Sequence, residues 1–291
     1  MNTLYRTMFF VPGNSPTKLV KSEIYGADCI IYDLEDSVSI YEKDSARDLV
    51  KNFLLELRPA SAFGIRINAQ DTPYYEDDVK TMVPLIPQFL RLPKSETAQN
   101  IKDLDDLITQ YEEKSHIEIG TIKIIATIET ALGVYHAYDI ATASPRVIAI
   151  GLGAEDYRTD MTLINTDSGD ELLFARQQIS LAAHAAHVMP IDYVFSNFSN
   201  EKMFQTNVIQ GKNMGFTGKS VIHPAQIPIV HDIYAPTIEE INHAKEVFSA
   251  YTQTLTNSSG VTALKGKMID KPMVMRAKTI LSYAESLRKD I

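Results

Sequence analysis

The feature that most constrains the fold is a series of eight short apolar runs that recur along the whole chain. Nearly every run ends in a polar or charged residue, and the segments between runs repeat apolar residues at spacings of three and four, as helices do. Continuous apolar runs without alternation are typical of strands buried on both faces of a parallel sheet. Eight such strands with helices between them predict a (β/α)8 TIM barrel. The runs begin at Thr7, Cys29, Phe63, Phe89, Lys123, Val147, Ile191 and Lys219.

The length of 291 residues allows one barrel with an addition after it. We predict a catalytic barrel over residues 1–235 and a helical extension over residues 236–291, which we expect to make contacts between subunits. Thr237 and Glu240 form a T-x-x-E capping box that opens the first helix of the extension. A last helix is expected from roughly Met273 to Arg288, after a loop over residues 256–272 that contains Gly260, Gly266 and Pro272.

Composition excludes several classes of partner. The net charge of -9 argues against nucleic acid or an anionic membrane surface as the main partner. No stretch approaches the roughly 18 apolar residues that a membrane span needs. The N-terminal apolar run is too short for a signal peptide. Cys29 is the only cysteine, so no intrachain disulfide can form. We expect a cytoplasmic protein.

The ends of the apolar runs nominate the active site, because the active site of a TIM barrel lies at the carboxyl ends of its strands. These ends are rich in carboxylates and include an arginine, a combination that suits a metal ion beside an anionic substrate. The nominated residues are Glu35, Asp36, Arg66, Asn68, Lys94, Glu129, Asp156, Asn197 and His223.

Glu129 and Asp156 end two neighbouring runs, and adjacent strands lie about 4.8 Å apart. Two carboxylates with open positions beside them suit Mg²⁺, which keeps water ligands and takes the rest of its shell from the substrate. The alternative is a salt-bridge role at the rim of the barrel. The sequence favours a Mg²⁺ site.

Arg66 is expected to point into the mouth of the barrel, where a buried guanidinium needs an anionic partner. The partner can be a substrate carboxylate, an internal carboxylate of Glu35 or Asp36, or both. Glu35 and Asp36 can orient Arg66 and a metal-bound water, or one of them can act as a base.

Three other features have competing interpretations. The segment GLGAED lacks the third glycine of a dinucleotide fingerprint, so Gly153 and Ala154 more plausibly let the backbone approach a small ligand. Lys94 suggests a Schiff-base aldolase as an alternative. The nearby carboxylates argue against this alternative, because they would keep the lysine protonated. Residues 158–174 make a long connection that either shapes the pocket or is a surface insertion.

Several motifs in order resemble the citrate lyase β-subunit family, which is the citryl-CoA lyase group within the malyl-CoA lyase and HpcH/HpaI aldolase superfamily. The motifs are RTMFFVPGN, YGADCIIYDLEDSV, EKDSAR, RINA, LPKSET, TIET, GLGAEDY and GKSVIHPAQI. The resemblance runs from Arg6 to about Ile227 and continues in YAPTIEEI and LKGKMID. It implies a TIM barrel that uses Mg²⁺ to cleave a citryl thioester, carried on CoA or on an acyl-carrier subunit, into acetyl thioester and oxaloacetate by a retro-Claisen reaction.

The resemblance also implies roles for individual residues. The family's metal ligands correspond to Glu129 and Asp156, and its substrate-binding arginine corresponds to Arg66. Glu129 would also contact the substrate, together with the backbone at Gly153 and Ala154. Three residues of the first strand and the helix after it would lie near the CoA or pantetheine arm: Phe10, Val11 and Lys21.

Two departures from the family pattern bear on the substrate. Ser15 stands where malyl-CoA lyases carry an arginine, and IHPAQI from Ile222 stands where many citrate lyase subunits have INPRQI. The IHP form resembles stand-alone lyases, so a citramalyl-CoA or malyl-CoA lyase is the alternative.

The resemblance implies a trimer, a hexamer or a complex with citrate lyase α and γ subunits. A non-catalytic assembly subunit or metabolite sensor is a further alternative.

Overall fold

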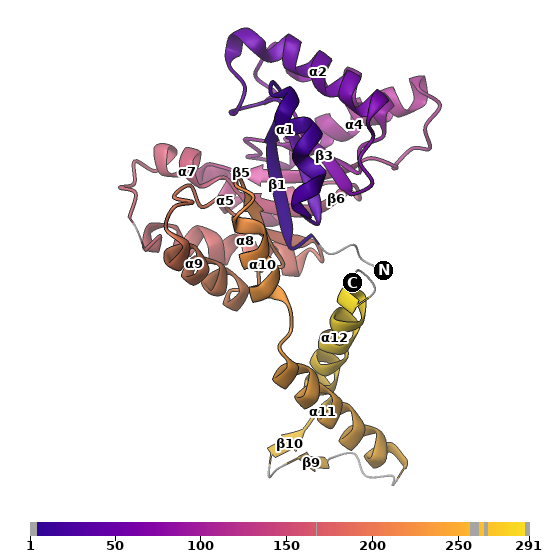
Figure 1. Cartoon of the computed structure of the whole chain (residues 1–291), viewed down its shortest axis with the longest axis vertical. Helices are drawn as coiled ribbons and strands as arrows, with labels where there is room; N and C mark the ends of the chain where they lie inside the picture. Colours follow the sequence, from indigo (N-terminus) through magenta and orange to yellow (C-terminus); the bar gives the residue numbers. More distant parts are fainter. Residues whose placement is uncertain (1–4, 167, 257–261, 265–266, 289–291) are drawn as a thin grey trace. The chain divides into compact units, whose positions relative to one another are not determined.

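The computed structural model describes residues 5–166, 168–256, 262–264 and 267–288. Its first eight strands are all parallel and hydrogen-bonded in sequence order, and β8 pairs with β1 to close the ring. The predicted TIM barrel is therefore confirmed (Figure 1). The strands are β1 (Thr7–Pro12), β2 (Cys29–Asp33), β3 (Ala62–Arg66), β4 (Phe89–Leu92), β5 (Lys123–Ile128), β6 (Val147–Leu152), β7 (Met189–Asp192) and β8 (Gly218–Val221).

Helices follow the strands, as a parallel barrel requires. They are α1 (Pro16–Lys21), α2 (Lys43–Glu56), α3 (Tyr75–Met82), α4 (Ala98–Lys114), α5 (Ala131–Tyr135), α6 (Ala137–Thr142), α7 (Ala154–Asp160), α8 (Leu173–Ala185), α9 (Glu201–Asn213) and α10 (Gln226–Tyr234). Short 3-10 helices are η1 (Ser22–Tyr25), η2 (Ile40–Glu42), η3 (Val83–Leu85) and η4 (Asp170–Leu172). The caps are local: the side chain of Thr130 accepts the Gly133 N–H at 3.1 Å and starts α5.

Alternate residues of the strands fill the inside of the barrel. One cluster of buried side chains draws on six strands and on the residue before β1: Tyr5, Met8, Phe10, Cys29, Ile31, Phe89, Ile125, Ala149 and Ile191. The ring of Phe89 needs the space beside Gly64 of β3, because a Cβ there would fall 2.1 Å from a ring carbon. Large side chains and a glycine thus share one layer, which keeps the interior packed.

One strand differs from the prediction. The run expected from Ile191 to Asn197 forms a strand only up to Asp192, and the strand begins at Met189. Tyr193 and Phe195 are buried although they lie in the loop that follows. Their burial explains why this loop has the apolar composition of a strand.

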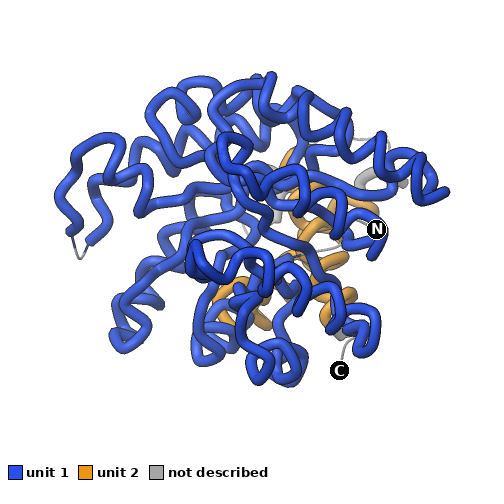
Figure 2. Tube along the Cα trace, turned by 90° about the horizontal axis from the view of Figure 1, so that it is seen from above, with its two compact units in different colours: residues 1–231 blue, residues 232–291 orange. Residues whose placement is uncertain are grey.

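The chain divides into two compact units, residues 1–231 and residues 232–291, which Figure 2 shows in separate colours. In the second unit α11 (Ile238–Thr256) and α12 (Lys271–Arg288) share a small core that includes Ala244, Val247 and Val274. The capping box is present: the Thr237 N–H donates to Oε2 of Glu240 at 2.8 Å, and the Glu240 N–H donates to Oγ1 of Thr237 at 3.1 Å.

The loop predicted over residues 256–272 is wrong in part. Strands β9 (Thr262–Leu264) and β10 (Lys267–Ile269) pair antiparallel there, and α12 already begins at Lys271. Gly260 and Gly266 lie outside the described residues. No helix in the described part of the chain is both long and apolar enough to cross a membrane.

Candidate active site

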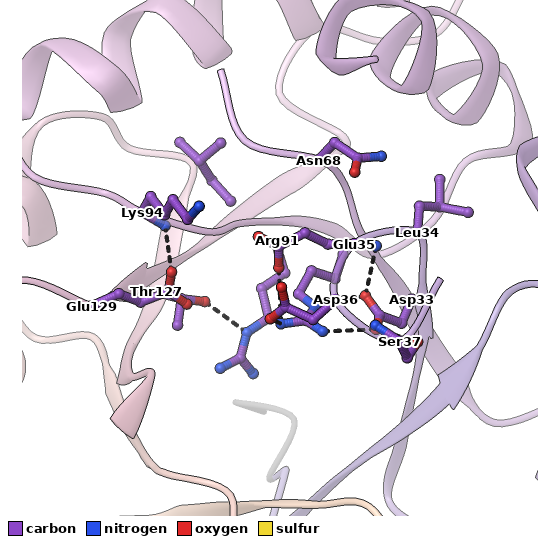
Figure 3. A network of polar contacts seen from close by, with 12 residues as sticks. Asp33, Leu34, Glu35, Asp36, Ser37, Asn68, Arg91, Lys94, Thr127 and Glu129 are labelled. Carbon is purple, nitrogen blue, oxygen red and sulfur yellow. Dashed lines mark hydrogen bonds and ion pairs between the residues drawn. The ribbon is translucent and has the colours of Figure 1, made fainter. Parts of the chain in front are cut away.

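Asp33 and Arg66 form the central ion pair at the carboxyl ends of β2 and β3. Nε and Nη2 of Arg66 donate to Oδ1 and Oδ2 of Asp33 at 2.6 and 2.7 Å. The same carboxylate accepts the backbone N–H groups of Glu35 and Ser37 at 3.0 and 3.1 Å (Figure 3). Burial would raise the pKa of Asp33, but Arg66, the hydroxyl of Ser37 and the N–H of Glu35 hold that pKa below its usual range. Asp33 therefore stays ionised and orients the guanidinium.

Arg66 also contacts the two carboxylates that the sequence named as its internal partners. Its Nη1 lies 2.9 Å from Oε2 of Glu35 and 3.1 Å from Oδ2 of Asp36. Glu35 is buried, whereas the side chain of Asp36 is 60% exposed. The internal pairing, one of the alternatives that the sequence left open, is present, and the structure adds Asp33 as a partner that makes two hydrogen bonds.

Glu35 is held in place through its backbone. Nζ of Lys43 in α2 donates to the carbonyl oxygens of Leu34 and Glu35 at 2.9 and 2.7 Å. Among the described residues, Oε2 of Glu35 has no well-aligned hydrogen-bond donor, although it lies in ionic contact with Arg66. Burial is the main cause that raises the pKa of Glu35 to about 8; Arg66 opposes this, and the charge of Glu129 adds to it.

Glu129 follows β5 and is buried. Its Oε2 accepts the backbone N–H of Lys94 at 3.1 Å, and Lys94 has a positive φ of 49° that turns this N–H toward the carboxylate (Figure 3). Gly153 lies against the other side, because a Cβ there would fall 2.5 Å from both Cγ and Oε1 of Glu129. Only a glycine leaves room for the carboxylate in this position.

Asp156 lies in the first turn of α7, just after β6, and is partly buried. Burial and then the charge of Asp156 raise the pKa of Glu129 to about 7. The two carboxylates are therefore close enough to repel each other, as two ligands of one cation do when the cation is absent. The pairing of Glu129 with Asp156 as ligands of one metal ion stays a prediction.

The donor set fits Mg²⁺. Among the described residues there is no group of three or more His, Cys, Asp or Glu side chains that suits a metal ion. Two carboxylates with a third, poorly satisfied oxygen of Glu35 nearby leave open positions for water and substrate oxygens. Mg²⁺ prefers such a site over an all-protein cage, and the absence of a His or Cys cluster disfavours zinc.

The residues predicted to lie near the CoA arm are in different environments. Phe10 points into the barrel, where the guanidinium carbon of Arg66 lies 5.0 Å from the centre of its ring. Val11 is 1% exposed, so its side chain offers no surface to a ligand. Lys21 ends α1 and is exposed. It stays a prediction that Phe10, Val11 and Lys21 bind CoA. Val11 could contact CoA only through its backbone.

Among the described residues, the side chains of four other nominated residues make no hydrogen bond or ion pair with Glu35, Glu129 or Asp156. Asn68 is turned toward α3 and donates from Nδ2 and from its backbone N–H to Oδ2 of Asp78 at 2.6 and 2.9 Å. Asn197 is exposed in the loop after β7. His223 stacks on Phe198 with ring centres 4.8 Å apart. Lys94 has an exposed side chain and reaches the site through its N–H, which does not favour the Schiff-base alternative.

A cavity of about 320 Å³ lies beside α7 and the loop after β7. It is lined by Glu155 and Arg158 of α7, and by Asn165 and Thr166 of the long connection. The interpretation in which residues 158–174 shape a pocket is therefore supported. The described part of that connection contains η4 and the start of α8.

Sequence reasoning missed Asp33, Lys43 and Arg91. Asp33 is the last residue of β2 and was counted within an apolar run, although it continues the inward series Cys29, Ile31, Asp33. Arg91 lies in the interior of β4, two positions after the inward Phe89. Period-two alternation was the signal that could have found both.

Comparisons with known proteins identify the family of the chain. The family model described as HpcH/HpaI aldolase/citrate lyase matches residues 6–224, and a model of a C–C bond lyase of the TIM-barrel fold matches residues 174–287. The chain is 45% identical over 284 residues to the citrate lyase subunit beta of Leuconostoc mesenteroides, which covers 97% of this chain and 94% of the relative. It is 28% identical to the human mitochondrial citramalyl-CoA lyase, over 98% of this chain and 86% of the relative.

A solved structure is also similar over nearly the whole chain. Protein CitE from Mycobacterium tuberculosis, in complex with magnesium, acetoacetate and coenzyme A, superposes with a TM-score of 0.80 at 27% identity. The superposition covers 98% of this chain and 100% of that chain. The chain forms a closed barrel, and the family model spans most of its length. The chain therefore belongs to the HpcH/HpaI aldolase/citrate lyase family and is a carbon–carbon lyase.

Proposed function

We propose that this lyase uses Mg²⁺ to cleave a citryl thioester into acetyl thioester and oxaloacetate. The observation that carries the proposal is the juxtaposition of two carboxylates, the buried Glu129 and the partly buried Asp156, with a guanidinium that Asp33 holds in one orientation. A cation site beside a fixed arginine suits a substrate with a carboxylate next to a hydroxyl group. Such a substrate is a 3-hydroxy-3-carboxyacyl thioester.

Glu129 and Asp156 would hold the Mg²⁺. When bound, the ion supplies a Lewis acid that makes the substrate hydroxyl more acidic. Gly153 keeps the space in which the Glu129 carboxylate sits, and the Lys94 N–H fixes one of its oxygens. The neighbouring backbone at Gly153 and Ala154 is where we expect the small end of the substrate to lie.

Arg66 would stabilise the oxygen that becomes the ketone. Because Asp33 already fixes the guanidinium, little reorganisation is needed as negative charge develops on that oxygen. Arg66 also forms ion pairs with Glu35 and Asp36. The negative charge of these carboxylates around Arg66 is smaller when one of them carries a proton.

Glu35 is the better of the two candidate bases. It is buried and its pKa of about 8 suits proton exchange near neutral pH, whereas Asp36 is mostly exposed. As the hydroxyl proton leaves, the carbon–carbon bond breaks and its electron pair forms the enolate of the thioester. Protonation of that enolate gives the acetyl thioester.

Support for the acyl group comes from the relatives. A citrate lyase subunit beta is 45% identical and is matched over 94% of its length, and the similar structure from M. tuberculosis contains magnesium and coenzyme A. The 28% identical citramalyl-CoA lyase, together with IHPAQI in place of INPRQI, favours citramalyl-CoA or malyl-CoA as the alternative substrate.

We also propose the context in which the enzyme acts. The substrate would be carried on CoA or on an acyl-carrier protein, with citrate lyase α and γ subunits as partners in the second case. A cytoplasmic location and a homo-oligomer, a trimer or a hexamer in which residues 232–291 make contacts, complete the proposal.

The test is turnover by the purified chain alone. Citryl-CoA and citramalyl-CoA are supplied separately with Mg²⁺, and oxaloacetate and pyruvate are measured. We expect oxaloacetate from citryl-CoA, loss of turnover with EDTA, and loss of turnover in Arg66→Ala. The exposed Asp106→Asn of α4 is the matched control and should behave as wild type. Efficient cleavage of citramalyl-CoA with none of citryl-CoA would overturn the assignment of citrate.

A further inference from the structure

Arg91 is a second guanidinium inside the barrel, and it makes only neutral contacts. Its side chain is buried in the middle of β4. Nε donates to Oγ1 of Thr127 at 2.8 Å, as Figure 3 shows, and Nη1 lies 3.4 Å from Oγ of Ser220 and 3.9 Å from Sδ of Met8. Hydroxyl and thioether groups satisfy hydrogen bonds but do not balance the charge.

Within the part of the chain that the structure describes, no ion pair within 4.0 Å reaches Arg91. The other fully buried arginine of the barrel, Arg176, pairs with Asp192 at 2.9 Å. A guanidinium removed from water without a paired anion destabilises the fold. Methionine would fill a similar volume without that cost, so packing alone does not account for an arginine here.

The charge of Arg91 lies next to the proposed substrate site. Its guanidinium carbon is 4.9 Å from the centre of the Phe10 ring, and that of Arg66 is 5.0 Å from the same ring. The two cations therefore share one aromatic neighbour. Burial and then Arg66 lower the pKa of Arg91 to about 10, and the attraction of Glu129, Asp33 and Glu35 offsets this only in part. Among the described residues, Arg91 therefore adds to the floor of the site a positive charge that no carboxylate pairs within 4.0 Å.

The candidate substrates differ in one charged group. The ketoacid half of a citryl thioester carries a CH2–COO⁻ group where a citramalyl thioester carries a methyl group. The other carboxylate and the hydroxyl are common to both. A buried cation that acts across the low dielectric of the barrel distinguishes the two substrates without touching either.

We propose that Arg91 is a specificity-determining residue whose buried positive charge, beside the Phe10 ring that it shares with Arg66, favours substrates with a second carboxylate on the ketoacid half. This inference rests on the proposed function and adds to it the residue that selects the acid. Arg66 serves both acids, because it faces the oxygen that they have in common. Arg91 favours the citryl thioester, which carries the additional carboxylate.

The first experiment measures binding. Oxaloacetate and pyruvate, the ketoacids that differ by this carboxylate, are titrated calorimetrically with Mg²⁺ into wild type, Arg91→Met, Arg91→Gln and Arg91→Lys. In wild type oxaloacetate should bind more tightly than pyruvate. In the two neutral variants the ratio of the oxaloacetate affinity to the pyruvate affinity should fall about tenfold, because oxaloacetate binds more weakly. The pyruvate affinity should stay within about twofold of wild type. Arg91→Lys should keep most of the preference.

The second experiment measures kcat/KM for citryl-CoA and citramalyl-CoA in the same variants. A structural defect lowers both values together, whereas lost charge selection lowers the citryl value alone. If neither neutral variant folds, Arg91→His, whose ring is charged at low pH and neutral at high pH, replaces them. Its ratio of citryl-CoA to citramalyl-CoA turnover should fall severalfold relative to wild type as pH rises and the ring loses its proton, and a ratio that follows wild type contradicts the inference.

Two outcomes separate this inference from the proposed function. Wild type that does not cleave citryl-CoA contradicts the proposed function. Wild type that cleaves citryl-CoA, with the same ratio of the two substrates in folded Arg91→Met, overturns only the role of Arg91.

Discussion

Both carboxylate oxygens of Asp33 accept hydrogen bonds from Arg66, at 2.6 and 2.7 Å. The same carboxylate also accepts hydrogen bonds from two backbone N–H groups, which fix its position. The arginine proposed to stabilise the developing ketone is thus fixed before any substrate arrives. Fixed donors cost less reorganisation during the reaction than mobile ones.

Asp33→Asn should therefore lower kcat/KM for the thioester by about 100-fold, since the amide offers one acceptor to a guanidinium that loses its buried anionic partner. Steady-state kinetics with a thermal melt checks this. Asp36→Asn is the matched control, because its exposed carboxylate makes a single contact of 3.1 Å with Arg66. Its effect should stay below about fivefold. Equal losses of kcat/KM in the two variants would contradict the role of Asp33 in orienting Arg66.

Asp156→Asn should weaken Mg²⁺ binding by more than about tenfold, because loss of a ligand should exceed the usual effect of losing an outer-shell partner. The melting temperature should change little, since a partly buried carboxylate at the rim contributes little to the packed core. Calorimetric titration with Mg²⁺ measures the affinity, with Asp106→Asn as the control. Unchanged affinity would remove Asp156 from the metal site.

Gly153→Ala should weaken Mg²⁺ binding by about tenfold or more although it removes no ligand. The new Cβ would fall 2.5 Å from Oε1 of Glu129 and push the carboxylate away. The same titration measures the change. Glu129→Gln combined with Gly153→Ala should then bind Mg²⁺ no worse than Glu129→Gln alone. An additional loss in the double variant would show that Gly153 acts by another route.

Binding of Mg²⁺ should release protons at neutral pH. With a pKa of about 7, Glu129 is about half protonated at pH 7 without the ion and must ionise to bind it. Calorimetry in buffers with different ionisation enthalpies should report about half a proton released at pH 7, less at pH 9, and an affinity that rises with pH in between. Release that does not depend on pH would contradict the raised pKa of Glu129.

Without Mg²⁺ the stability of the fold should fall as pH rises. The pKa of Glu35 is about 8 in the folded protein and 4.5 as an isolated side chain, so the folded state holds more protons between these values. The contribution of Glu35 to stability is therefore full below pH 4.5 and is lost as pH approaches 8. Thermal melts from pH 5 to 8 should show this slope in wild type and a smaller one in Glu35→Gln. An equal slope in both would assign the effect to other groups.

Much of the barrel could be predicted from the sequence because buried parallel strands are both apolar and short. The starts of β2, β4 and β5 were predicted at Cys29, Phe89 and Lys123, where the structure has them. The end of β7 could not be predicted, because the loop after it continues the apolar composition with Tyr193 and Phe195.

Part of the site was predictable for a similar reason. Glu129, Arg66 and Glu35 were nominated because strand ends converge at one face of the barrel. Asn68 was nominated by the same rule and lies elsewhere, because β3 ends at Arg66 and the backbone then turns toward Asp78. Asp33 was missed because the apolar run was read on to Glu35 and Asp36, so the end of β2 at Asp33 was not recognised. Side-chain direction, not proximity to a strand end, decides which polar residues enter the site.

Pairing between β1 and β8 joins Met8 to Ser220, and Arg91 contacts both of these residues. A ribosome releases β1 first and β8 last, so the ring stays an open sheet with two bare edges for most of synthesis. Nascent chains cut before Lys219 can already contain Asp33, Arg66 and Glu129, yet Arg91 would lack its hydroxyl partner from the final strand. The floor of the site is thus the last part of the barrel to mature.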